Sequence, residues 1–367
     1  MSATIFFDTV LILGVGLIGG SVARGLRERF LAREIVGLDS DPETLTTALG
    51  LGVIDVAHLS VGNWVKNVDL VVLAVPVRAL PGLLNSLIPF LSETCILTDV
   101  GSVKAPLLGA ISSFPSDIQK RFVGGHPMAG SERAGVQHSS ASLLQNAIWV
   151  LTPTAQTQVS TLERVQELVA ALGANPVVLE PSAHDKLVAT VSHLPYLSAL
   201  ALTRLIARHE DRDGLALLAA GGFRDLTRVA SGDPRMSRDM VVENRTAVLE
   251  AIRRYRNELG ALEEMLETPE LLLEAATEGK RSRDSLPVVR RSLLPGLHDV
   301  VVLIPDQPGE FARITTLLGN EAVNIKDIEV LVMREQGGAV RLGFASLDEA
   351  TDAKFLLERA GYPVRGR

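Results

Sequence analysis

The sequence places one histidine where it can act as a general base. His126 lies in the segment GHPMAGSE at 125–132, directly after a short apolar run at 122–125. An imidazole can take the proton of a substrate hydroxyl near neutral pH while hydride leaves the same carbon. Pro127 and Gly130 are expected to hold this loop in one shape. The alternative is a loop histidine without a chemical role.

A serine and a lysine follow a second apolar run, at 95–100. The Ser102 hydroxyl is expected to orient His126 or to contact a cofactor. It can also cap a helix that begins at Val103. The charge of Lys104 is expected either on the cofactor side or in solvent.

Three glycines after a third apolar run have the spacing of a dinucleotide-binding turn. Gly14 permits the turn out of the strand, Gly16 lets the backbone approach a pyrophosphate, and Gly19 lets the next helix lie close to the strand. The helix N-terminus then offers free N–H groups to the phosphates. The expected cofactor-binding residues are Gly14, Gly16, Leu17, Ile18, Gly19, Asp39, Val75, Pro76 and Ser102.

An acidic residue selects among dinucleotides. Asp39 ends the apolar run at 34–38, twenty residues after Gly19. A carboxylate there accepts both ribose hydroxyls and repels a 2′-phosphate, so the expected cofactor is NAD rather than NADP. FAD stays open, although no second flavin-type feature accompanies the turn. No metal is expected.

Two further groups lie in the second half of the chain. His193 precedes Leu-Pro195 inside a helical pattern, which the proline is expected to kink, and a buried histidine satisfied by backbone is the alternative to a functional one. Arg224 and Arg228 lie four residues apart on one helix face. Their guanidinium groups suit a carboxylate ligand, and a solvated face with Asp225 paired to an arginine is the alternative.

The first 180 residues alternate apolar runs with helical patterns. The expected strands are 10–13, 34–38, 68–75, 95–100, 122–125, 148–151 and 176–179, with helices between several of them, as at 79–91 and 158–172. Repeated βα units predict a parallel, doubly wound α/β sheet of the Rossmann type, which binds ligands outside the carboxyl ends of its strands. The glycine turn, Val75, Ser102 and His126 are therefore expected along one crevice.

Two different patterns follow. Residues 181–280 read as an all-α domain, with helices at 184–208, 214–220, 223–230 and 235–266, and its wide apolar faces predict a homodimer. A basic and polar stretch predicts a linker at 281–295. Residues 296–367 have the order βαββαβ, with strands at 299–304, 323–333, 339–345 and 362–364, which predicts a ferredoxin-like third domain.

Composition excludes several classes of protein. The 367 residues are 47% hydrophobic and carry a formal net charge of −7, which argues against nucleic acid or an anionic membrane as partner. The single cysteine, Cys95, allows no internal disulfide. Without a membrane-spanning run or a secretory signal, a cytoplasmic enzyme is expected.

Together, these motifs resemble the prephenate dehydrogenase family, in the form that carries a C-terminal ACT domain. The resemblance rests on GVGLIGG at 14–20, DVGSVK at 99–104, GHPMAGSE at 125–132, SHLPY at 192–196 and FRDLTRVASGDPRM at 223–236. In the third domain it rests on VVLIPDQPGEFARI at 301–314 and VNIKDIEV at 323–330. The glycine motif alone is unspecific, whereas GHPMAGSE with SHLP and FRDLTR is specific.

The resemblance implies that prephenate and NAD become 4-hydroxyphenylpyruvate, carbon dioxide and NADH. It implies that His126 accepts the ring-hydroxyl proton and that Ser102 positions this histidine and the cofactor. His193 and Arg228 match substrate-binding residues, and Glu132 matches an acid at the site entrance.

Three alternatives stay open at this point. An arogenate dehydrogenase acts on a substrate that bears an amine as well as a carboxylate. A β-hydroxyacid dehydrogenase needs a catalytic lysine on the helical domain, for which Lys186 is the nearby candidate. A non-catalytic amino-acid sensor would use NAD structurally.

The third domain resembles regulatory modules that bind amino acids. Its turn at 306–309 leads into a helix at Glu310, whose N–H groups can receive a ligand carboxylate. Gly309 lets a ligand approach the backbone, and Asn324 can bind the amine or carboxylate of that ligand. The implied pathway ends in tyrosine, so L-tyrosine is the expected feedback inhibitor, and a module that only supports dimerisation is the alternative.

Overall fold

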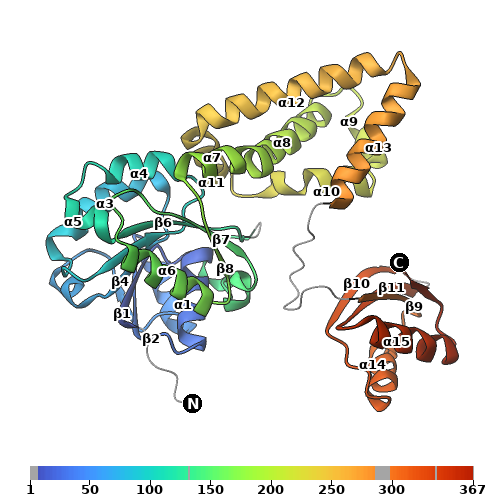
Figure 1. Cartoon of the computed structure of the whole chain (residues 1–367), viewed down its shortest axis with the longest axis horizontal. Coiled ribbons are helices and arrows are strands. Elements are labelled where there is room, and N and C mark those ends of the chain that lie inside the picture. The colour runs from blue at the N-terminus through green and yellow to red at the C-terminus, as the bar shows by residue number, and fades with distance from the viewer. Residues whose placement is uncertain (1–6, 131–132, 286–297, 335–336, 367) are drawn as a thin grey trace. The chain divides into compact units, whose positions relative to one another are not determined.

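The computed structural model describes residues 7–130, 133–285, 298–334 and 337–366. The chain divides into two compact units, Met1–Pro287 and Val288–Arg367, and each is described by itself (Figure 1).

An eight-stranded sheet forms the first part of the first unit. Its strands are β1 (Phe7–Leu13), β2 (Ala32–Leu38), β3 (Val56–His58), β4 (Leu70–Leu73), β5 (Ile96–Asp99), β6 (Phe122–Pro127), β7 (Ile148–Thr152) and β8 (Asn175–Val178). The strand order is β3-β2-β1-β4-β5-β6-β7-β8, with the neighbours from β3 to β6 parallel. The short strand β3 was not among the expected strands.

The expectation of a wholly parallel sheet is wrong at one pair. β7 runs antiparallel to β6, and β8 is parallel to β7. A parallel neighbour requires a long crossover, usually a helix. Within its described residues, the segment between β6 and β7 forms only two short 3-10 turns, η4 (Val136–His138) and η5 (Ala141–Leu144), so the chain reverses instead.

Helices cover both faces of this sheet and bury two separate cores (Figure 1). One face carries α1 (Leu17–Glu28), α2 (Pro42–Gly50) and α6 (Val159–Ala171), and the other carries α3 (Leu80–Leu87), α4 (Ala105–Ile111) and α5 (Ser116–Arg121). Alternation along β1 divides its side chains accordingly: Val10 and Ile12 enter the first core, and Leu11 and Leu13 enter the second. Burial on both faces explains the continuous apolar run.

A buried ion pair joins the carboxyl ends of β5 and β6. The Asp99 carboxylate accepts hydrogen bonds from the ammonium of Lys104 and from the backbone N–H groups of Gly101 and Gly125, at 2.8 and 3.0 Å. Lys104 Nζ also donates to the Gly125 carbonyl at 2.8 Å. The Lys104 side chain has no exposed surface, so a solvated charge is excluded. Burial lowers the pKa of Lys104, and Asp99 opposes that shift.

Helices form the rest of the first unit, with two breaks that were not expected. They are α7 (Pro181–Val188), α8 (Leu194–Ala207), α9 (Arg212–Leu218), α10 (Gly221–Thr227), α11 (Pro234–Glu243), α12 (Arg245–Met265) and α13 (Pro269–Ser285). A π-helical turn, η6 (Ala189–His193), separates α7 from α8. Asn244 separates α11 from α12, where one continuous helix was expected. Because α13 continues to Ser285, the first residues of the expected linker are helical.

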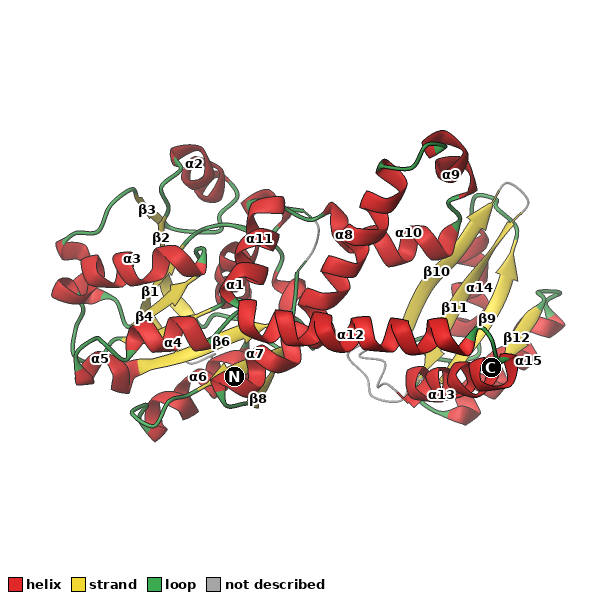
Figure 2. Ribbon diagram, turned by 90° about the horizontal axis from the view of Figure 1, so that it is seen from above, coloured by secondary structure: helices red, strands yellow, loops and turns green. Residues whose placement is uncertain are grey.

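The helical region buries little apolar surface within the chain. Its small core joins η6 and α12 through Ala189, Val248 and Ala251, and α8 lies beside α12 (Figures 1 and 2). Large apolar side chains stay exposed along these helices, including Leu205, Leu217, Leu218, Leu226, Met236, Leu259 and Leu266. In the described part of the chain, no helix combines the length and apolar character needed to cross a bilayer.

The second unit has the expected βαββαβ element order. It comprises β9 (His298–Ile304), α14 (Glu310–Asn320), β10 (Asp327–Arg334), β11 (Gly337–Phe344), α15 (Leu347–Arg359) and β12 (Val364–Gly366). The strand order is β10-β11-β9-β12, with every neighbouring pair antiparallel (Figure 2). Side chains of β9 and β11 pack with those of α14 and α15 in a core separate from those of the first unit.

We expect Lys104→Met to lower the unfolding free energy of the N-terminal domain by about 3–5 kcal/mol, because the buried Asp99 carboxylate loses its cation. Urea unfolding followed by tryptophan fluorescence measures this domain, since both tryptophans, Trp64 and Trp149, lie in it. The exposed Lys120 of α5 provides the control, and Lys120→Met should change the free energy by no more than about 0.5 kcal/mol. Equal effects of the two substitutions would contradict this prediction.

Candidate active site

The glycine turn after β1 has the geometry that its sequence predicts. Gly14 has a φ of +93°, and a Cβ there would lie 2.5 Å from the Ala74 carbonyl oxygen. A Cβ on Gly19 would lie 2.1 Å from the Gly14 carbonyl oxygen, so α1 packs too closely for any side chain. A Cβ on Gly16 would have no atom within 4 Å. The space before Gly16 is therefore open to a ligand.

The start of α1 fits a pyrophosphate. Gly16 is the N-cap residue, and Gly20 is the first residue whose N–H bonds back to it, at 2.9 Å. The preceding N–H groups, including those of Leu17 and Ile18, have no partner within the helix, as at any helix start. These groups and the helix dipole favour an anion before Gly16.

Asp39 is fixed beside the glycine turn at the end of β2. Its Oδ2 accepts from the Val15 N–H at 2.9 Å, and its Oδ1 accepts from the Asp41 N–H at 3.0 Å. A carboxylate has further lone pairs for ribose hydroxyls, and its charge opposes a 2′-phosphate. The turn, α1 and Asp39 together fit NAD.

Three expected cofactor contacts follow the next two strands. Val75 is half-buried and Pro76 exposed after β4, and Ser102 is half-buried after β5. Among the described residues, the Ser102 hydroxyl makes no hydrogen bond to His126. Ser102 is also not a helix cap, because α4 begins at Ala105 with Lys104 as its N-cap residue.

His126 lies within β6 and contacts a second histidine that no sequence motif indicated. Its Nδ1 is 2.8 Å from Nε2 of His184, and Nδ1 of His184 is 2.8 Å from Oδ1 of Asp185. The two rings meet edge to face. Burial lowers the pKa of His126 well below its usual value, and the charge of Lys104 lowers it further. His126 is therefore neutral at physiological pH and can accept a proton.

Asp185 connects α7 to α4. Its carboxylate accepts from the N–H groups of Lys104 and Ala105, at 2.9 and 2.8 Å, and so caps α4. His184 and Asp185 are both buried. This carboxylate therefore holds the α7 histidine against the sheet.

His193 ends the π-helical turn and is 1% exposed. Its Nδ1 is 3.3 Å from Nδ2 of Asn244, which also donates to the backbone carbonyl of Asp185 at 2.7 Å. Its Nε2 is buried and makes no hydrogen bond to the described residues. Burial lowers the pKa of His193 to about 4. His193 is thus a neutral group with one polar atom left for a ligand.

The other selected residues are exposed or lie outside the described part. Arg228 is exposed on the short turn η7 (Arg228–Ser231), which packs against α8, and Arg224 is exposed on α10. Lys186 is exposed on α7, next to the buried Asp185. Glu132 lies outside the described residues.

The expected regulatory residues lie in the second unit. Gly309 adopts a φ of +92° as the N-cap residue of α14, so it is required by the turn conformation. Asn324 is exposed between α14 and β10. Beside this turn, the buried Glu310 carboxylate accepts from the Tyr362 hydroxyl at 2.9 Å and from Arg313 at 2.8 Å.

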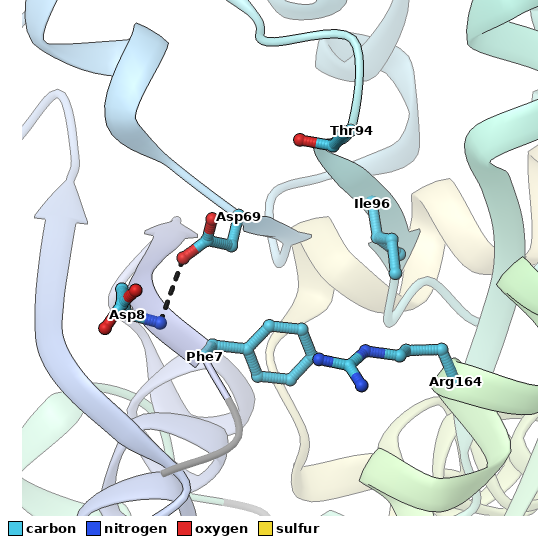
Figure 3. Close-up of a pocket in the computed structure, with 6 residues that line it drawn as sticks. All are labelled: Phe7, Asp8, Asp69, Thr94, Ile96 and Arg164. Atoms are coloured by element: carbon cyan, nitrogen blue, oxygen red, sulfur yellow. Dashed lines mark hydrogen bonds between the residues drawn. The ribbon is translucent and has the colours of Figure 1, made fainter.

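A shallow hollow of about 270 Å³ lies at the opposite, amino ends of the strands (Figure 3). Asp69 accepts there from the Asp8 N–H, and the Arg164 guanidinium lies 5.3 Å from the centre of the Phe7 ring. Ligands of doubly wound sheets bind at the carboxyl ends. This hollow is therefore not the cofactor site.

Comparisons with known proteins agree over most of the chain. The family model for the prephenate dehydrogenase nucleotide-binding domain matches residues 22–178, and that for the prephenate dehydrogenase dimerization domain matches residues 180–275. A curated prephenate dehydrogenase of Bacillus subtilis is 34% identical and aligns over 97% of either chain.

Solved structures match about three quarters of the chain. Prephenate dehydrogenase of Aquifex aeolicus, in complex with hydroxyphenyl propionate and NAD+, superposes with a TM-score of 0.72 at 36% identity, covering 76% of this chain and 98% of that chain. Arogenate dehydrogenase of Synechocystis superposes with a TM-score of 0.65 at 32% identity, covering 75% of this chain and 99% of that chain.

Two glycine substitutions should separate ligand binding from folding. We expect Gly16→Ala to fold normally but to weaken NAD binding by at least about tenfold, or 1.4 kcal/mol, because the methyl group enters the space before α1. Gly19→Ala should instead lower the unfolding free energy by about 1–3 kcal/mol, because α1 must move from β1. Calorimetric NAD titration and urea unfolding measure the two effects. Unchanged NAD affinity in Gly16→Ala would refute this cofactor position.

Proposed function

Because the chain belongs to the prephenate dehydrogenase family, we propose that it oxidises prephenate with NAD to 4-hydroxyphenylpyruvate, carbon dioxide and NADH. The observation that carries the proposal is the position of a neutral, half-buried His126 on the same sheet edge as the glycine turn. β1, β4, β5 and β6 are consecutive neighbours, so their carboxyl ends form one continuous edge. This edge therefore places a proton acceptor and a nicotinamide site where both can contact the same substrate.

The chemistry divides between cofactor and protein. NAD, when bound, supplies the acceptor for the hydride of the hydroxyl-bearing carbon. His126 accepts the hydroxyl proton as the carbonyl forms. The bond to the ring carboxylate breaks, carbon dioxide leaves, and the electron pair passes through the ring to the carbonyl oxygen. That oxygen takes a proton back as the ring becomes aromatic, which gives the phenol and returns His126 to its neutral form. The protein chiefly holds a dianion against the cofactor and removes one proton.

Substrate binding falls chiefly to two residues of the helical region, His193 and Arg228. His193 directs a buried, unpartnered Nε2 to the substrate. Arg228 supplies a guanidinium group for one substrate carboxylate, and Glu132 acts at the entrance. Ser102, half-buried after β5, contacts the nicotinamide side of the cofactor.

Arogenate is the second candidate substrate. The Synechocystis structure, which covers a similar share of this chain, is an arogenate dehydrogenase. The two substrates differ at the side chain, where arogenate has an amino group in place of the keto oxygen of prephenate. Prephenate is favoured because two relatives that align over nearly the whole chain are prephenate dehydrogenases.

NADH formation measured with each substrate tests the activity. We expect the wild type to turn over prephenate with a higher kcat/KM than arogenate. His126→Asn should lower kcat by about two to four orders of magnitude with little change in substrate affinity, because it removes the proton acceptor. Near-normal turnover in His126→Asn would remove this histidine from the mechanism. A higher kcat/KM with arogenate would make arogenate, rather than prephenate, the substrate.

The chain is organised, in this proposal, as an NAD-binding domain at 1–180, a helical substrate and dimerisation domain from 181, a linker, and a regulatory domain at 296–367. The exposed leucines of α8 to α13 supply the contact surface of a homodimer. A monomer would leave these side chains in water, at a cost of about 25 cal/mol for each Å² of apolar surface. The match to a dimerization-domain family model supports the same state.

The second unit is, in this proposal, a ferredoxin-like module of the ACT class that binds L-tyrosine. Its βαββαβ order and the strand order β10-β11-β9-β12 support this assignment. The turn at Gly309 presents the start of α14 to a ligand carboxylate, and Asn324 offers an amide beside it. Feedback inhibition requires that tyrosine bind the less active state more tightly, with about 1.4 kcal/mol of coupling for a tenfold difference.

A chain ending at Ser285 tests this regulation. The Aquifex structure corresponds to only 76% of this chain, so a catalytic unit without the last quarter is expected to fold. We expect tyrosine to inhibit the full-length enzyme and to leave the shortened enzyme unaffected, with turnover retained. Equal inhibition of both forms would place tyrosine in the active site as a competitor. Absence of inhibition in both would refute tyrosine as the effector.

A further inference from the structure

We propose that Asp185 is a positioning residue that sets the tautomers of the two site histidines in opposite senses. Its side chain makes His126 a proton acceptor, and its backbone carbonyl makes His193 a hydrogen-bond donor. The catalytic consequence rests on the proposed function, whereas the tautomers themselves are measurable without substrate.

The side-chain branch runs from Asp185 through His184 to His126. The Asp185 carboxylate is held by the N–H groups of Lys104 and Ala105, and it can only accept a hydrogen bond from Nδ1 of His184. The proton of a neutral His184 therefore lies on Nδ1, which leaves a lone pair on Nε2. That lone pair faces Nδ1 of His126 at 2.8 Å, so Nδ1 of His126 must donate. Nε2 of His126 is then free to accept the substrate proton.

The backbone branch runs through Asn244 to His193. The Asp185 carbonyl accepts from Nδ2 of Asn244 at 2.7 Å, which fixes the orientation of that amide. The same Nδ2 lies 3.3 Å from Nδ1 of His193, so Nδ1 must be the acceptor. The proton of His193 therefore lies on Nε2, the atom that is buried without a partner among the described residues. This N–H suits an oxygen of the substrate.

Both branches matter only if the histidines are neutral, because a doubly protonated imidazole has no tautomer. Burial lowers the pKa of both rings, to about 4 for His193, which keeps them neutral at physiological pH. With the opposite tautomer, His126 would present an N–H to the substrate hydroxyl and could not accept its proton. Asp185 also stabilises the cation that forms when the proton reaches His126, without taking up that proton itself.

A matched pair of substitutions tests the side-chain branch. His184→Leu removes the acceptor for His126 Nδ1, and we expect kcat to fall by about 10²- to 10⁴-fold with little change in KM. His184→Gln offers an amide oxygen as a replacement acceptor, and it should recover most of this loss. Equal kcat values in the two variants would overturn the branch.

The backbone branch predicts the opposite kinetic signature. Asn244→Leu releases Nδ1 of His193, so KM for prephenate should rise at least about tenfold while kcat falls less. A fall in kcat without a rise in KM would overturn this branch. Thermal unfolding and NAD titration identify any variant that fails to fold.

Histidine ¹⁵N NMR of the full-length wild type in the presence of NAD measures the tautomers directly, even if a variant does not fold. Signals among the seven histidines are assigned by their loss in His126→Gln and His193→Gln. We expect an unprotonated Nε2 on His126 and a protonated Nε2 on His193. The reverse state of either ring overturns the proposal. The expected tautomers in an enzyme that does not oxidise prephenate would uphold the positioning role and refute the proposed function instead.

Discussion

A single lysine without access to water connects the parts of the site. The ammonium of Lys104 is balanced by Asp99 and by the carbonyl of Gly125, which fixes the end of β6 next to His126. The backbone N–H of the same lysine binds Asp185, which holds α7. Burying a charge costs several kcal/mol unless its geometry is well satisfied. The cost is offset here by contacts that also align the sheet with the helical region.

The sequence was informative wherever one local rule determines the structure. Apolar runs located seven of the eight strands of the first sheet. For central strands such as β1 and β4 the reason is burial on both faces, which leaves no polar alternation, whereas the edge strand β8 is largely exposed. The glycine turn was predicted residue by residue, since Gly14 and Gly19 each meet a backbone atom that excludes a side chain. Strand β3 was missed because three half-buried residues make no recognisable run.

Contacts across the fold could not be read in the same way. His184 lies 58 residues from His126, and nothing in its helix indicates that it meets β6. Asn244 lies within a continuous helical pattern in the sequence, so its role could not be recognised there. In the structure it separates α11 from α12, and its side-chain amide contacts the Asp185 carbonyl and His193. The environment of Lys104 was left open between the cofactor side and solvent. The sequence around a lysine does not reveal whether an acid five residues earlier, here Asp99, lies beside it in the interior. For Asn244, the signal available was a polar residue inside an otherwise helical pattern.

The π-helical turn at Ala189–His193 constrains how this gene can vary. Each residue of a regular helix turns the chain by about 100°, so removing one residue here would rotate α8 and the ring of His193 away from Asn244. Val191 in this turn is exposed, and a change of side chain there should be tolerated. A single-codon deletion at the same place should not be. The segment is thus free in composition at exposed positions such as Val191, but fixed in length, a pattern that natural variants of the gene would display.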